Sequence, residues 1–186
     1  DYGHSILATN WAPTCHHGLV ATDSQGLRWW EDYHGHSFEL DADAGTLVIR
    51  GRIEGQPIRY VRSYTFGDEA LGVRLQLSAE ADLSLAALVE NIPYARWEWK
   101  ARGADAVAGE AREGETQANS FCIVDRTGAG VMVTLSEVMP LRLVPQGLKT
   151  PGWRRLQIGR VEIVLPARWS AGQEMEISYE VKPLKQ

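Results

Sequence analysis

Five histidines are the first residues of this chain that could do chemistry, and all of them lie within its first 36 residues: His4, His16, His17, His34 and His36. If residues 33–38 are extended, His34 and His36 project from one strand face together with Trp30 and Asp32. Two imidazoles and a carboxylate are zinc ligands by type, and His16 or His17 could complete a tetrahedral set. Their spacing is not that of a standard zinc module, so solvated histidines near a sheet end are the simpler interpretation.

Tryptophan is the second concentration, with seven residues in a chain of 186. Trp29 and Trp30 are adjacent, so in a strand their rings point to opposite faces and one of them leaves the core. An exposed indole beside polar side chains such as Arg28 or His34 is a common platform for a sugar ring. The alternative is that both rings belong to the core.

Arg62 places a charge where alternation predicts an apolar side chain, because Ile58, Tyr60, Tyr64 and Phe66 share its parity. Its guanidinium then pairs inside the protein or reaches a cleft, since an unpaired buried charge is costly. A β-bulge that turns Arg62 to solvent is the third interpretation. Tyrosine and arginine on one face would suit an acidic sugar. The candidate carbohydrate contacts are Trp29, Trp30, Tyr33, His34, His36 and Arg62.

The sequence carries none of the common enzyme signatures: no GxGxxG, P-loop, GxSxG, CxxC pair or HExxH. Paired carboxylates would suffice for a metal-free enzyme, but 24 acidic residues offer no way to choose a pair. No catalytic residue is therefore assigned, and the chain is not expected to be catalytic on its own. No cofactor is expected either, zinc being the single candidate.

The segments that must position these residues are predicted to be strands separated by turns. Residues 58–66 and 71–77 alternate apolar and polar side chains on either side of residues 67–69, which predicts an antiparallel hairpin. Turn residues predict three further hairpins, at 23–26, 41–45 and 126–130. The side chains expected in the core are Ile49, Val73, Leu75, Leu77, Val133, Ile163 and Ile177.

Residues 81–92 fit either a helical face or a strand. A strand is favoured because the neighbours are strands and a lone helix would need a packing layer of its own. Pro93 is expected to end the element, and residues 103–119 are expected to form a weak strand or a long loop. About a dozen strands predict an all-β fold, a large antiparallel β-sandwich of two packed sheets, with a closed barrel as the alternative.

Composition limits the function classes. The length of 186 residues predicts one domain, residues 1–186, and a net charge of −5 with scattered basic residues argues against nucleic acid. No apolar run approaches the roughly 20 residues that cross a bilayer. Cys15 and Cys122 allow at most one disulfide, and the sequence does not show whether they pair. The chain starts at Asp1 without a methionine, so a processed protein or a piece of a longer one is expected.

Residues 59–66, the turn and residues 70–77 resemble the sheet domain that follows the helical toroid in heparinase II/III-type polysaccharide lyases. The shared features are an Arg-x-aromatic strand, a short turn and an apolar strand. His4 begins a segment similar to the family's His-Asn-Thr-Val strand, although Ser5 replaces the Asn, and Gln76 stands where the family has an acidic residue. Only His4 is carried over as a family residue. The resemblance covers the sandwich half alone, and implies that the toroid with most of the active site is absent.

Together these features favour a carbohydrate-associated β-sandwich module, an accessory or C-terminal part of a polysaccharide-degrading enzyme. The expected partners are an oligo- or polysaccharide, acidic ones included, and an N-terminal domain of the parent chain. A bacterial protein in the periplasm or secreted is favoured. The alternatives are a structural or protein-interaction domain, which a flat exposed apolar patch would favour, and a metal-dependent enzyme.

Overall fold

The computed structural model describes residues 18–31, 35–97, 102–103, 105–125, 127–145 and 156–184, and these residues form strands and turns with no helix. No helix in these ranges is therefore long and apolar enough to cross a membrane. The strands are β1 (Gly18–Thr22), β2 (Arg28–Trp30), β3 (Ser37–Asp41), β4 (Thr46–Arg52), β5 (Ile58–Phe66), β6 (Leu71–Ala79), β7 (Leu83–Ser84), β8 (Ala87–Trp97), β9 (Arg102–Gly103), β10 (Asp105–Val107), β11 (Gly114–Val124), β12 (Gly130–Val144), β13 (Leu156–Leu165), β14 (Arg168–Trp169) and β15 (Glu174–Leu184).

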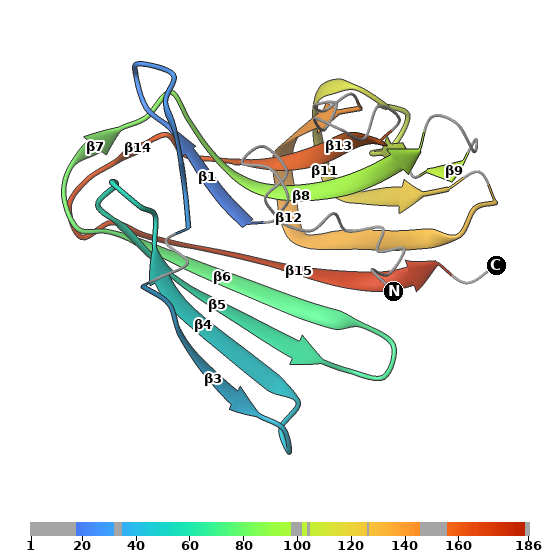
Figure 1. Cartoon of the computed structure of the whole chain (residues 1–186), viewed down its shortest axis with the longest axis horizontal. Helices are drawn as coiled ribbons and strands as arrows, with labels where there is room; N and C mark the ends of the chain where they lie inside the picture. The colour runs from blue at the N-terminus through green and yellow to red at the C-terminus, as the bar shows by residue number, and fades with distance from the viewer. Residues whose placement is uncertain are drawn as a thin grey trace.

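One large antiparallel sheet curls into a half-barrel, so that its two ends face each other as the layers of a sandwich (Figure 1). Its strand order is β2-β1-β8-β13-β12-β15-β6-β5-β4-β3, and β7 with β14 forms a small second sheet. The corner is β12, whose first half pairs with β15 and whose second half pairs with β13. The register of β11 against β12 shifts between Ala118 and Ser120, and such irregularities allow a strand to pass from one layer to another. The predicted all-β antiparallel sandwich is confirmed.

All four predicted hairpins are present, and aspartate side chains hold three of their turns, at Asp23, Asp41 and Asp125. Asp23 Oδ1 accepts hydrogen bonds from the backbone N–H groups of Gln25 and Leu27, at 2.9 Å each. Asp125 Oδ1 accepts the N–H of Thr127 at 2.8 Å. These contacts join residues within a few positions of each other in the sequence. The turns could therefore be predicted from the sequence alone.

The central hairpin, β5 with β6, supplies much of the core. Leu75 and Leu77 are 0% and 2% exposed, and six of the seven predicted core side chains are buried. The exception is Ile49 of β4, which is only partly buried because β3 and β4 extend away from the layer that contains β8 and β13 (Figure 1).

The segment 81–92 forms strand rather than helix, as favoured: residues 83–84 lie in β7 and residues 87–92 in β8. The expectation that Pro93 ends the element is wrong, because β8 continues to Trp97 and Pro93 pairs with Arg160 of β13. The described pairing of β8 with β1 stops at Asn91. Pro93 therefore lies beyond the last β1–β8 pair, where its missing N–H breaks no hydrogen bond of that pairing. Residues 103–119 contain β10 and the start of β11 rather than a long loop.

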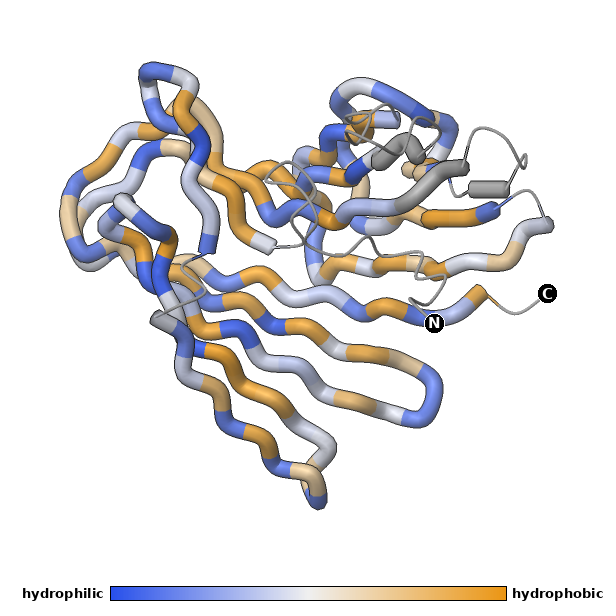
Figure 2. Tube along the Cα trace, in the orientation of Figure 1, coloured by the Kyte–Doolittle hydropathy of each residue, from blue (hydrophilic) through white to orange (hydrophobic). Residues whose placement is uncertain are grey.

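Strands β3, β4 and β5 carry apolar residues, drawn as orange positions in Figure 2, and their register puts Phe38 and Leu40 on the same face as the inward-facing Arg62. Phe38, Leu40 and Phe66 are 77%, 65% and 56% exposed. Leu40 pairs with Leu47, and Phe38 with the partly buried Ile49. We call the exposed three the apolar overhang.

Candidate functional site

Arg62 lies at the centre of a buried polar network. Its side chain keeps the inward parity of β5, because the pairing of β5 with β6 is unbroken from Ile58 to Phe66, so the bulge interpretation is wrong. Arg62 is 2% exposed, and its Nη1 lies 2.8 Å from Glu31 Oε1 while its Nη2 lies 2.7 Å from Glu90 Oε2. Of the interpretations given for this residue, internal pairing is the one that the structure confirms.

Tyrosines extend the network at both ends. Tyr60 donates its hydroxyl to Glu31 Oε2 at 3.0 Å and also contacts His36 Nε2, and Tyr179 donates to Glu90 Oε1 at 3.1 Å. Tyr60 and Tyr179 come from one layer and Glu90 from the other. The network, namely Glu31, His36, Tyr60, Arg62, Glu90 and Tyr179, therefore ties the two layers together through their shared interior.

Charge in this network is unbalanced, because two carboxylates face one guanidinium. Burial raises the pKa of Glu90 to about 7, although Arg62 acts in the opposite direction, and Glu31 adds to the rise. Burial disfavours the charged form of Arg62, but Glu90 and Glu31 together hold its pKa well above the ordinary value. Glu90 is 0% exposed, and a general acid or base must reach the proton that it transfers. The network is thus a structural tie between the layers.

Glu90 predicts a specific pH dependence of stability. Between its ordinary pKa of 4.5 and about 7, the folded protein keeps a proton on Glu90 that the unfolded chain releases. The stabilisation is complete below the lower value and is lost as the pH rises through the higher one. We expect the free energy of unfolding to fall by about 3 kcal/mol from this group between those two pH values.

Urea unfolding of wild type and Glu90→Gln at several pH values measures this contribution, because the amide cannot ionise. The difference between the two free energies of unfolding should change with pH across this window. Glu180→Gln, which removes an exposed carboxylate, is the matched control and should follow wild type. Parallel curves for wild type and Glu90→Gln would show that Glu90 is ionised throughout.

Of the residues proposed from the sequence, His36 and Arg62 are brought together through Tyr60 and Glu31. Asp32, Tyr33 and His34 lie outside the described residues, as do His4, His16 and His17. The zinc hypothesis therefore stays a prediction. Within the described ranges, no three His, Cys, Asp or Glu side chains form a group that could hold a metal ion.

The two adjacent tryptophans have different surroundings. Trp29 packs against the core and donates Nε1–H to Asp23 Oδ2 at 3.1 Å. A Cβ on Gly55 would lie 2.7 Å from its ring, so the indole rests directly on glycine backbone. Trp30 instead lines a small surface hollow with Arg28. Both rings are half-buried, so neither is the largely exposed platform that simple alternation predicts.

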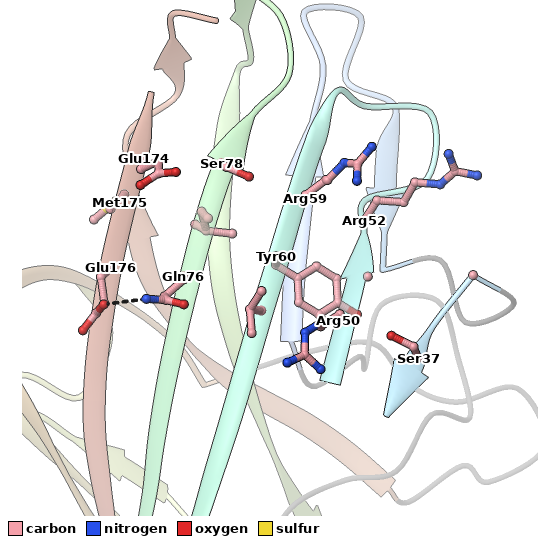
Figure 3. A pocket seen from close by; sticks show the side chains of 14 residues that line it. Ser37, Arg50, Arg52, Arg59, Tyr60, Gln76, Ser78, Glu174, Met175 and Glu176 are labelled. Carbon is pink, nitrogen blue, oxygen red and sulfur yellow. Dashed lines mark hydrogen bonds between the residues drawn. The ribbon is translucent and has the colours of Figure 1, made fainter. Parts of the chain in front are cut away.

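A broad hollow lies on the face of β5 that presents Arg59, the opposite parity to the buried Arg62 (Figure 3). It encloses about 700 Å³ and crosses five neighbouring strands, β3, β4, β5, β6 and β15. We call it the outer hollow; its polar lining residues are Ser37, Arg50, Arg52, Arg59, Tyr60, Gln76, Ser78, Glu174 and Glu176, of which Tyr60 also belongs to the buried network. With four inter-strand spacings, the hollow is roughly 19 Å wide.

Charge is segregated across the outer hollow, with arginines on β4 and β5 and glutamates on β15. Arg50 pairs with Glu39 at 3.2 Å, and Arg59 pairs with Glu80 at 2.6 Å. Glu176 accepts from Arg74 at 2.7 Å and from Gln76 at 3.0 Å. Exposed pairs of this kind contribute little stability, so a charged ligand could exchange with them at small cost.

Sequence reasoning missed the outer hollow. The available signal was that Arg50 and Arg52 share the outward-facing parity of their strand, which places two arginines on one exposed face. The hollow forms only because β6 pairs with β15, which lies about 100 residues further along the chain. Alternation within one strand carries no information on such a pairing.

Protein family models and curated protein sequences give no match to this chain. Solved structures do: 4-α-glucanotransferase from Thermococcus litoralis has a TM-score of 0.63 at 13% identity over 96% of this chain. Heparinase III has a TM-score of 0.60 at 12% identity over 93%, and heparan sulfate lyase HepC from Pedobacter heparinus has 0.53 at 11% over 98%. The matches cover only 29%, 24% and 28% of those three chains. The chain therefore has a fold that also occurs as one part of larger carbohydrate-active enzymes, and its resemblance to heparinase-type lyases is a resemblance of fold.

Proposed function

We propose that this chain is a carbohydrate-binding accessory module and that it holds an acidic oligosaccharide in the outer hollow. The observation that carries the proposal is the row of arginines Arg50, Arg52 and Arg59 in a wide polar trough. Guanidinium groups bind carboxylates and sulfates through paired, charge-assisted hydrogen bonds. Gln76 and Ser78 supply neutral groups for sugar hydroxyls along the same path.

The fold comparisons support the carbohydrate part of this proposal, because glucanotransferase and heparinase chains contain the same fold. The matched part makes up 29% of the glucanotransferase chain and 24% of the heparinase chain. The proposal is therefore that catalysis belongs to another part of a longer polypeptide, with this module contributing affinity.

Affinity electrophoresis in gels with acidic or neutral polysaccharide tests the proposal. Wild type should be retarded by the acidic polysaccharide, and Arg52→Ala or Arg59→Ala should bind about tenfold more weakly, the cost of one lost charge-assisted hydrogen bond. Arg168→Ala removes an exposed arginine of β14 that does not line the hollow, and should behave as wild type. Unchanged retardation in both hollow variants would place binding elsewhere, and no retardation of wild type would end the proposal.

The apolar overhang favours a second candidate, a structural or protein-interaction domain. Large exposed apolar side chains that lie together on a sheet face commonly mark protein contacts. Phe38 and Phe66 would then pack against another domain of the parent polypeptide. If wild type binds no glycan, this candidate takes precedence.

A further inference from the structure

Trp30 and Arg28 lie in a second polar hollow, on the other layer of the sandwich. It encloses about 110 Å³, and its lining shares no residue with the outer hollow. We call it the Trp30 notch; its lining side chains used below are Arg28, Trp30, Asn91, Arg142, Arg160 and Glu162.

Strand register explains why residues so distant in sequence meet here. Trp30 is paired with Val20, and Val20 with Val89 on β8. On β8, two residues after Val89, Asn91 is paired with Glu162 of β13, and Glu162 is paired in turn with Arg142 of β12. Directly paired residues lie on the same face of a sheet, so the notch is built on one face across five strands.

A partly buried cluster of ion pairs fixes the charged side chains of the notch. Glu162 is 7% exposed, and its carboxylate accepts from Arg142 Nη1 at 3.0 Å and from Arg160 Nε at 2.6 Å. Arg142 is also paired with Glu115, at 2.7 Å. Arg28 is exposed and forms no ion pair with any described residue. Three guanidiniums against two carboxylates leave the notch with a net positive charge.

An indole beside fixed guanidiniums combines an apolar ring surface with charged donors. A space of about 110 Å³ is small for a whole sugar ring but admits one charged substituent. We propose that the Trp30 notch binds the carboxylate or sulfate of an acidic sugar, with Arg28 as its exposed donor and the sugar ring against Trp30. This rests on the proposed binding of acidic glycans, and adds a contact on the opposite layer.

Monosaccharides test the notch separately from the outer hollow. We expect glucuronate to shift the backbone amide resonances of residues 20–30 and 87–91 in the ¹⁵N-labelled protein, while glucose at the same concentration does not. Glucosamine N-sulfate distinguishes a preference for sulfate from one for carboxylate. Shifts with glucose equal to those with glucuronate, or none at these residues, would overturn the inference.

Variants separate this inference from the proposed function. Arg28→Ala should weaken glucuronate binding at least fivefold, and Trp30→Leu should do so as well, whereas Arg52→Ala should leave it unchanged. Because Arg28 is exposed, its replacement keeps the fold and the test remains decisive if Trp30→Leu unfolds. A further outcome is that glucuronate shifts the notch resonances of wild type while the outer-hollow variants still bind polysaccharide as wild type does. That pair of results would support the notch and refute the outer hollow. Unaltered glucuronate binding in Arg28→Ala would refute the notch alone.

Discussion

Replacing Arg62 by Met should lower the free energy of unfolding by about 3–5 kcal/mol, the range for removing one partner of a buried ion pair. Methionine fills much of the same volume but leaves Glu31 and Glu90 facing each other in the core without a cation. Neither carboxylate is open to bulk solvent, which could otherwise replace the lost hydrogen bonds, since Glu31 is 6% and Glu90 0% exposed. Urea unfolding followed by tryptophan fluorescence measures the loss.

Arg74→Met is the matched control, because Arg74 pairs with Glu176 at a similar distance but is exposed, and it should cost less than about 1 kcal/mol. Combining Arg62→Met with Glu31→Gln and Glu90→Gln removes the net charge and should restore part of the stability. A loss in Arg62→Met no greater than in Arg74→Met would contradict the buried network.

Leu75→Ala should cost about 2–5 kcal/mol, the range for a large-to-small change in a packed core. Leu75 is 0% exposed, at the middle of β6, and is paired with Arg62 on one side and Ile177 on the other. The neighbouring Gln76 is exposed, so Gln76→Ala should stay within about 0.5 kcal/mol of wild type. Equal effects of the two substitutions would mean that β6 presents its other face to the core.

Local patterns predicted the strands well and their partners poorly. Alternation in residues 58–77 and the aspartate-bearing turns involve neighbours in sequence, so the hairpins followed directly. Parity also marked Arg62 as unusual. Its partner Glu90 is 28 residues away, inside the ambiguous segment 81–92, and no rule within a strand could select it among 24 acidic residues.

The tryptophans show the second limit. Adjacent rings do point to different surroundings, but the backbone of Gly55 and the carboxylate of Asp23 cover Trp29 on its side. Trp30 is partly enclosed in a notch to which β8, β12 and β13 contribute. Exposure depends on what the rest of the fold places over a residue, and alternation does not contain that information.

Arginine footprinting tests the central claim, binding of an acidic glycan in the outer hollow, most directly. Phenylglyoxal modifies exposed guanidinium groups, and mass spectrometry reports the extent at each arginine with and without a saturating heparan sulfate oligosaccharide. We expect protection of Arg50, Arg52 and Arg59, no change at Arg168, and no protection by a neutral maltooligosaccharide. Equal modification of the three hollow arginines with and without the acidic glycan would contradict the claim.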